Sequence, residues 1–291
     1  MSELDTKPLI AVVDLASLLD DPRLRVIDCR FELGNPASGE QAYLQSRIPG
    51  ARYVHLERDL SDMSACAEHG RHPLPSSEQL DALRARFDIS PHTHVVAYDH
   101  DTGAYAARLW WLLRESGHAQ VQVLDGGFAA WRSAGLPQER DTPRTPQSSS
   151  AAIRMAPLRR AAWLDADALQ SGLDAGTLTL VDARAAARFR GDVEPMDALA
   201  GHVPGALNRP FQDNLGADGQ FKPAARLREE FLRLLVGRTP DSVVHMCGSG
   251  VTACHNQLAM FHAGLPGSRL YADSWSGWIT DRARPVATGC S

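Results

Sequence analysis

The sharpest chemical signal in this chain is one cysteine and the loop that follows it. Cys247 opens the run Cys-Gly-Ser-Gly-Val-Thr-Ala, which follows the apolar stretch 243–246 and precedes a helical pattern. Gly248 and Gly250 let the backbone bend so that several N–H groups point at the sulfur. These dipoles favour an anion, so a thiolate here would be a nucleophile, and the same donors would hold a persulfide anion. The alternative is a buried structural cysteine after a strand.

The elements that must position this loop follow an alternating pattern. Short runs rich in β-branched residues predict strands at 25–28, 95–98, 121–124, 178–182, 243–246 and 269–271. Between them, helical patterns cover 77–87, 104–116 and 251–263. The alternation predicts an α/β fold with a largely parallel sheet flanked by helices. In such sheets ligands bind at the carboxyl ends of the strands, where the cysteine loop lies.

The chain repeats itself once, with an offset near 150 residues. Val-Ile-Asp-Cys-Arg at 26–30 returns as Leu-Val-Asp-Ala-Arg at 180–184, and Ile-Pro-Gly-Ala at 48–51 returns as Val-Pro-Gly-Ala at 203–206. We therefore expect two copies of one domain, at 1–136 and 158–291. The stretch 137–157, rich in Pro and Ser, is the predicted linker. Asp99 or a near neighbour stands where the first copy would need its cysteine.

Composition narrows the class of protein. A chain of 291 residues suits two domains, each able to bury its own core. The net charge of −5 gives no reason to expect nucleic acid or an anionic membrane as a partner. The five cysteines form no C-x-x-C pair, which favours a reducing compartment, the cytoplasm, over a disulfide framework. The first ten residues predict no signal peptide, and no apolar run is long enough to cross a membrane.

The loop resembles the active-site loop of the tandem-rhodanese sulfurtransferases, specifically the mercaptopyruvate sulfurtransferase type. The likeness covers nearly the whole chain: both Asp-x-Arg segments, both Pro-Gly-Ala segments, the loop, and Ser-Trp-Ser-Gly-Trp at 274–278. It implies two rhodanese-like domains, of which only the second is catalytic. It also implies that Cys247 carries sulfur from 3-mercaptopyruvate to an acceptor, either a thiol such as that of thioredoxin or cyanide. No cofactor is expected.

The loop composition bears on the sulfur donor. In thiosulfate-preferring relatives, cationic side chains follow the cysteine and match a dianionic donor, whereas Gly248 and Ser249 are neutral. This suits mercaptopyruvate, whose charge lies on a carboxylate farther from the sulfur. We expect Gly248, Gly250, Val251 and Thr252 to line the donor site. Ser249 would hydrogen-bond the transferring sulfur or the substrate carbonyl, or act only as a loop cap.

The resemblance assigns the donor carboxylate to Arg188, a role suited to the guanidinium fork. The alternative is an ordinary surface arginine. The family usually supplies a second arginine shortly after Glu-Pro, but here Met196 follows that pair. The carboxylate clamp is therefore either single, which predicts a high KM for mercaptopyruvate, or completed by Arg190 or another cation. Gly277 is a further departure, because relatives often carry Glu there.

His72 lies in Gly-Arg-His-Pro-Leu-Pro at 70–75. In the mercaptopyruvate group the matching histidine, with an acidic residue upstream, is thought to act with the loop serine across the domain interface. Glu57 is the best match for that acid, and Asp59 is a weaker one. Such an array would polarise the substrate carbonyl or manage the proton of the departing enolate. The alternative is a histidine that caps a turn before two prolines.

Three other functions can be compared with a mercaptopyruvate sulfurtransferase on the basis of the sequence. A thiosulfate:cyanide sulfurtransferase would share the persulfide intermediate and differ in donor kinetics. A cysteine phosphatase needs an arginine six residues after the cysteine, where this chain has Ala253. A non-catalytic binding module fits the first domain but not the second, which keeps the loop.

Cys66, His69 and His72 have a spacing that could ligate a metal ion. No second pair of ligands follows at zinc-site spacing, so no metal is expected. Cys254 is predicted to lie in the core.

Overall fold

A computed structural model describes residues 7–140 and 156–289, so most of the predicted linker 137–157 lies outside the described residues. The chain divides into two compact units. The first gathers Met1–Ser61, Pro75–Arg159 and Ala217–Gln220, and the second gathers Asp62–Leu74, Arg160–Gly216 and Phe221–Ser291. Residues 62–74 therefore belong to the second unit, although they lie within the first sequence repeat.

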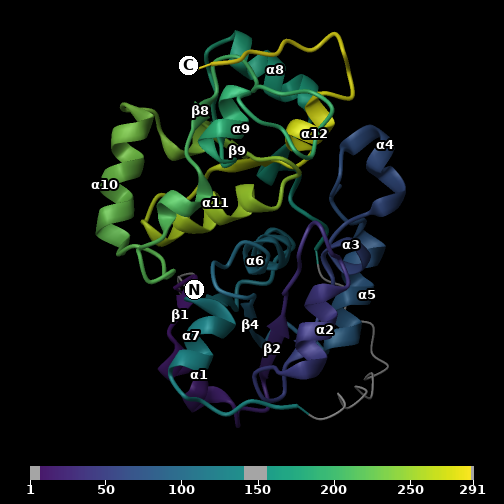
Figure 1. The fold of residues 1–291 in the computed structure, drawn as a ribbon, viewed down its shortest axis with the longest axis vertical. Helices are drawn as coiled ribbons and strands as arrows, with labels where there is room; N and C mark the ends of the chain where they lie inside the picture. The colour runs from purple at the N-terminus through teal and green to yellow at the C-terminus, as the bar shows by residue number, and fades with distance from the viewer. Residues whose placement is uncertain (1–6, 141–155, 290–291) are drawn as a thin grey trace. The chain divides into compact units, whose positions relative to one another are not determined.

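The first unit is built on a five-stranded sheet in which every pair of neighbouring strands is parallel. Its order is β1-β5-β4-β2-β3, with β1 at Leu9–Ile10, β2 at Leu24–Asp28, β3 at Arg52–Tyr53, β4 at His94–Tyr98 and β5 at Val121–Leu124. Figure 1 labels β1, β2 and β4 of this sheet. Its helices are α1 (Val12–Leu18), α2 (Ser38–Gln45), α3 (Leu56–Asp59), α5 (Ser77–Phe87), α6 (Ala106–Glu115) and α7 (Gly127–Ser133). Helix α6 packs against β4 and β5.

The second unit repeats this plan in the same order along the chain. Its parallel sheet runs β6-β10-β9-β7-β8, with β6 at Trp163–Leu164, β7 at Thr179–Asp182, β8 at Leu207–Asn208, β9 at Val243–Met246 and β10 at Arg269–Tyr271. Its α-helices are α4 (Cys66–His69), α8 (Ala166–Asp174), α9 (Ala186–Arg190), α10 (Ala224–Leu235), α11 (Thr252–His262) and α12 (Ser274–Trp278). Helix α11 packs against β9 and β10, as α6 does in the first unit.

These two sheets confirm the predicted α/β fold. All six predicted strands and three predicted helices are present, with ends shifted by at most two residues. Helix α5 begins where predicted because Ser76 and Gln79 form a capping box, each side chain accepting the other's backbone N–H. The two-residue strands β1, β3, β6 and β8 were not predicted from the sequence.

The repeated Asp-x-Arg segments have a structural role in both units. In the first, Arg30 donates to the Asp28 carboxylate and to the Ser46 carbonyl oxygen. In the second, Arg184 donates to the Asp182 carboxylate and, 2.7 Å away, to a backbone carbonyl oxygen. Both aspartates are fully buried, so each depends on its arginine for charge compensation.

Each unit has its own apolar core. The core of the first includes Tyr98, Phe128 and Trp131, and that of the second includes Trp275 and Trp278. Within the described ranges, no helix combines the length and the apolar composition that crossing a membrane requires.

Candidate active site

The loop at Cys247 joins β9 to α11 and is fastened to α12 by three backbone groups. The Cys247 N–H donates to Ser274 Oγ at 3.0 Å, and the Cys247 carbonyl oxygen accepts from the Trp275 N–H at 3.0 Å. The Gly248 carbonyl oxygen accepts from the Ser276 N–H at 2.9 Å. Cys247 itself is 2% exposed. The thiol is therefore held at the carboxyl end of a parallel strand in a fixed backbone.

Gly250 sets the bend of the loop. Its φ of +77° is in the left-handed region, and a Cβ atom there would collide with the Ala272 carbonyl oxygen. Val251 then occupies the N-cap position of α11 without a side-chain capping hydrogen bond, and Thr252 is the first helical residue. Cys254 is fully buried and its thiol lies 3.3 Å from the Gly250 carbonyl oxygen, which confirms that it belongs to the core.

The first repeat shows what this kind of loop does with an acidic side chain. Asp99 follows β4 as Cys247 follows β9. One carboxylate oxygen of Asp99 accepts from the Gly103 N–H at 2.9 Å, and the other accepts from Tyr105 and Ala106 at 2.8 and 3.3 Å. Burial raises the pKa of Asp99, and these three N–H donors oppose that shift. The strand–loop–helix turn thus directs several N–H groups at one buried acceptor.

His72 and Ser249, predicted to act together, are in contact. His72 Nδ1 lies 2.7 Å from Ser249 Oγ, and both residues are buried. The segment 62–74, which we call the arm, brings His72 to the loop. The other arm histidine, His69, pairs instead with Asp273, its Nδ1 lying 3.1 Å from the carboxylate. The two histidines therefore have separate partners.

The predicted acidic partner Glu57 lies in α3 of the first unit. The ring Nδ1 of His55 caps this helix by accepting from the Glu57 and Arg58 N–H groups. Asp59, the weaker match, accepts from the His55 N–H and pairs with Arg86. The role of either acid toward His72 stays a prediction.

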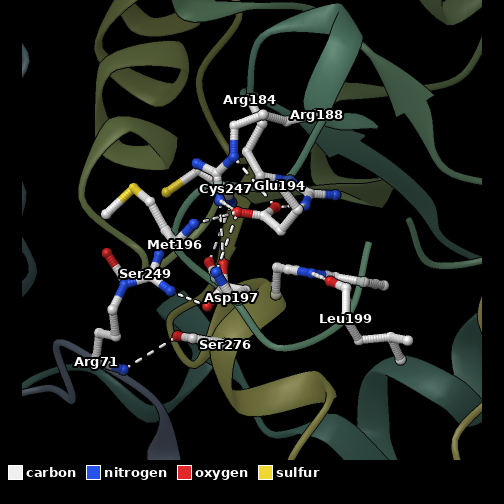
Figure 2. A network of polar contacts seen from close by, with 12 residues as sticks. Arg71, Arg184, Arg188, Glu194, Met196, Asp197, Leu199, Cys247, Ser249 and Ser276 are labelled. Carbon is white, nitrogen blue, oxygen red and sulfur yellow. Dashed lines mark hydrogen bonds and ion pairs between the residues drawn. The ribbon is translucent and has the colours of Figure 1, made fainter. Parts of the chain in front are cut away.

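Arg188 lies in a network of charged side chains beside the loop, with 17% of its side chain exposed. Its Nη2 donates to Glu194 at 2.7 Å and to Asp197 at 3.0 Å, and its Nε also donates to Glu194. Figure 2 shows the carboxylates of Glu194 and Asp197 lying among Arg71, Arg184 and Arg188. The guanidinium of Arg188 is therefore oriented by fixed carboxylates.

The other two positions considered for the carboxylate clamp have different surroundings. Arg190 pairs with Asp192 at 2.7 Å, and 37% of its side chain is exposed. Met196 is 39% exposed and contributes its backbone N–H, which donates to Glu194.

Sequence reasoning missed Arg71, Asp197, Ser274 and Ser276. Arg71 pairs with the Asp197 carboxylate, and its backbone N–H donates to Ser276 Oγ at 3.0 Å (Figure 2). Ser274 Oγ links the Cys247 N–H to the Tyr271 carbonyl oxygen. The available signals were the position of Arg71 directly before His72 and the two serines in the motif at 274–278.

The fold and this site define an α/β protein of two repeats, in which the second repeat bears a buried thiol at the end of a parallel strand. The rhodanese-like domain family matches residues 11–134 and 165–281. Over 282 residues, 97% of this chain and 98% of the relative, the chain is 47% identical to the probable 3-mercaptopyruvate sulfurtransferase of Pseudomonas aeruginosa. It is also 42% identical, over 97% of both chains, to the putative thiosulfate sulfurtransferase SseB of Mycobacterium tuberculosis.

Solved structures agree with these relatives. The crystal structure of SseA from Escherichia coli, described as a 3-mercaptopyruvate sulfotransferase, superposes with a TM-score of 0.77 at 30% identity, covering 93% of this chain and 100% of that one. The chain therefore belongs to the rhodanese family. The predictions of tandem rhodanese domains and of a sulfurtransferase enzyme are confirmed.

Proposed function

We propose that this chain moves sulfane sulfur from 3-mercaptopyruvate to a thiol or cyanide acceptor through a persulfide on Cys247. The observation that carries the proposal is the loop itself: a buried thiol at the end of β9, with the His72–Ser249 hydrogen bond beside it. Gly248, Gly250, Val251 and Thr252 form the wall of the donor site in this proposal, and Arg188 binds the donor carboxylate.

In the first half-reaction, the Cys247 thiolate attacks the sulfur of mercaptopyruvate. A sulfur–sulfur bond forms as the carbon–sulfur bond breaks, and the bonding electron pair passes to the organic fragment as the enolate of pyruvate. The Ser249 hydroxyl hydrogen-bonds the carbonyl oxygen while negative charge develops there, and His72 supplies the proton that converts the enolate to pyruvate. Glu57 would support His72 in this role.

In the second half-reaction, the acceptor attacks the outer sulfur of the persulfide. A thiolate acceptor, such as that of a thioredoxin-like protein, takes the sulfur as its own persulfide, and cyanide takes it as thiocyanate. In both cases the bond between the two sulfurs breaks and its electron pair returns to Cys247 as the thiolate. The cycle then closes without a cofactor.

The loop around Asp99 supports the idea that this turn holds an anion. Its three N–H donors lie between 2.8 and 3.3 Å from the carboxylate oxygens. At the matching place in the second unit, a persulfide anion on Cys247 would use the N–H groups at the start of α11 in the same way.

Thiosulfate is the second candidate donor, and two observations favour it. The relative from M. tuberculosis is named a putative thiosulfate sulfurtransferase. In addition, Arg71 places a cation against Gly248, so the surroundings of the loop are less neutral than the loop sequence. Steady-state kinetics with each donor tests the preference. We expect a larger kcat/KM for mercaptopyruvate, and a larger value for thiosulfate would leave only the general sulfurtransferase function.

A further inference from the structure

We propose that the first unit has a ligand site of its own, a pocket that binds a small organic monocarboxylate with an apolar body. The pocket has a volume of about 400 Å³, and every residue that lines it belongs to the first unit. Ligand pockets commonly measure roughly 300–1,000 Å³. The side chains on which the proposal rests are Arg30, Phe31, Glu32, His100, Phe128 and Arg132.

The pocket lies at the edge of the sheet where parallel sheets bind their ligands. Arg30 comes directly after the end of β2, His100 comes directly after the end of β4, and Phe128 follows β5 in the first turn of α7. Strands β5, β4 and β2 are neighbours in the sheet. The carboxyl ends of neighbouring parallel strands meet at one edge, and α/β proteins bind ligands there. The pocket therefore has the position of a binding site.

The same edge of the second unit carries Cys247. In the first unit the Cζ atom of Arg30 lies 4.5 Å from the ring centroid of Phe128, and in the second unit Arg184 lies 4.7 Å from Trp275 in the same way. The first repeat thus keeps the architecture of the site, although Asp99 replaces the nucleophile. Because Asp99 already occupies the N–H groups of its own loop, a bound anion would depend on side-chain donors.

Three side chains of the pocket offer hydrogen-bond donors. Arg132 and the ring of His100 are exposed, and neither makes a hydrogen bond or an ion pair with another described residue. The side chain of Arg30 is only 8% exposed. Its Nε and Nη2 donate to Asp28 and Ser46, whereas its Nη1 has no hydrogen-bond partner in the described parts of the chain. Arg132 would bind the carboxylate through its guanidinium fork, with Arg30 Nη1 as a second donor.

The other side chains select the kind of anion. The carboxylate of Glu32 has no hydrogen-bond partner within the described ranges, and its charge disfavours a dianion such as a phosphate monoester more than a monoanion. Phe31, Ala42 and Phe128 give the pocket an apolar wall. Gly39 lets α2 approach the end of β2, because a Cβ atom there would collide with the Arg30 carbonyl oxygen. Charge and wall together favour a monocarboxylate with an aromatic or aliphatic body.

The test is equilibrium binding of three probes to the full chain by isothermal titration calorimetry. The probes are 2-naphthoate, its neutral amide 2-naphthamide, and the dianion 2-naphthyl phosphate. The wild-type protein should bind 2-naphthoate more tightly than either of the others. Arg132→Met removes the cation and keeps the length of the side chain. It should raise the Kd of 2-naphthoate roughly 10- to 100-fold and leave the Kd of 2-naphthamide unchanged.

Two further variants of the pocket test the apolar wall and the selection by charge. Ala42→Phe places a ring in the pocket and should weaken the binding of both 2-naphthoate and 2-naphthamide. Glu32→Gln should strengthen the binding of 2-naphthyl phosphate more than that of 2-naphthoate, because it removes a repulsion that acts on two charges of the dianion.

The matched control is Arg23→Met. Arg23 belongs to the same unit and its side chain is 71% exposed, but it precedes β2 and so lies at the opposite end of this strand from Arg30. This variant should leave the Kd of every probe unchanged. Arg188→Met tests whether the probes bind beside Cys247 instead.

Four results would overturn the proposal. The first is that the wild-type protein binds none of the three probes. The second is that 2-naphthoate loses affinity in Arg188→Met and keeps it in Arg132→Met, since the probe would then bind at the sulfur-donor site. The third is equal affinity for the acid and its amide, and the fourth is tighter binding of the phosphate. None of these results bears on persulfide formation at Cys247, so this proposal and the proposed function fail separately.

Discussion

The hydrogen bond between His72 and Ser249 distinguishes the two candidate donors by their leaving groups. When mercaptopyruvate gives up its sulfur, a carbon atom departs with an electron pair and must gain a proton. When thiosulfate gives up its sulfur, sulfite departs and needs no proton to be stable in neutral water. A proton donor beside the loop therefore matters for the first reaction and much less for the second.

We predict that His72→Ala lowers kcat with mercaptopyruvate by about 100-fold, the lower end of what a positioned acid contributes. With thiosulfate the loss should stay below about 10-fold. Ser249→Ala should resemble His72→Ala, and the double variant should lose little more, because the pair acts as a unit. His92→Ala, at an exposed histidine of the first unit, is the matched control. Equal losses with both donors would contradict the assigned role.

At the scale of the element, the turn between β9 and α11 depends on Gly250. Gly250→Ala meets two obstacles: a φ of +77° and a collision with the Ala272 carbonyl oxygen. Gly205 has the same φ, but nothing lies within 4 Å of its Cβ position. We predict that Gly250→Ala lowers kcat/KM at least about 10-fold, whereas Gly205→Ala costs only about 1 kcal/mol of stability and leaves kcat/KM unchanged.

Activity assays and urea unfolding on the two variants separate backbone strain from displacement of the loop. If Gly205→Ala loses as much activity as Gly250→Ala, the loss of activity results from backbone strain and not from displacement of the Cys247 loop. The claim about the position of the Cys247 loop would then be wrong.

Some helices, strands and site residues were predictable from the sequence, and others were not. Strands β2, β4 and β9 were predictable because each contains a pair of adjacent β-branched residues in a mostly buried segment, and α5 because of its cap. The two-residue edge strands were not, since two residues carry no periodicity. Within the site, the loop residues were predictable because they follow Cys247 directly in the sequence. Arg71 and Ser274 were not, because their approach to Cys247 depends on how the arm and α12 pack.

At the scale of the whole molecule, each unit contains a deeply buried histidine whose pKa is strongly lowered by burial. Burial lowers the pKa of His118 in the first unit to about 4, and that of His245 in the second to about 3, from a value of 6.5. Below pH 6.5 the unfolded chain therefore binds protons that the folded chain does not. Stability should rise with pH across this range, and it should fall as the pH drops from about 6.5 toward 4.

We predict that the free energy of unfolding decreases between pH 6.5 and pH 5, with each histidine contributing up to about 1.4 kcal/mol per pH unit. Urea unfolding at a series of pH values measures this slope. His245→Leu should flatten it by removing one proton-binding group, whereas His92→Leu, at an exposed histidine, should leave the slope unchanged. A wild-type stability that does not change between pH 6.5 and pH 5 would contradict the account of both buried histidines.

The central claim is that sulfur travels on Cys247, and intact mass spectrometry under non-reducing conditions tests it most directly. After mercaptopyruvate, the wild-type protein should gain the mass of one sulfur atom, and cyanide should remove it as thiocyanate. Cys254→Ala, which changes only a buried core thiol, should gain the same mass, whereas Cys247→Ser should gain none. Fragmentation should place the added sulfur on the loop peptide. A sulfur adduct on Cys247→Ser, or none on the wild-type protein with either donor, would contradict the claim.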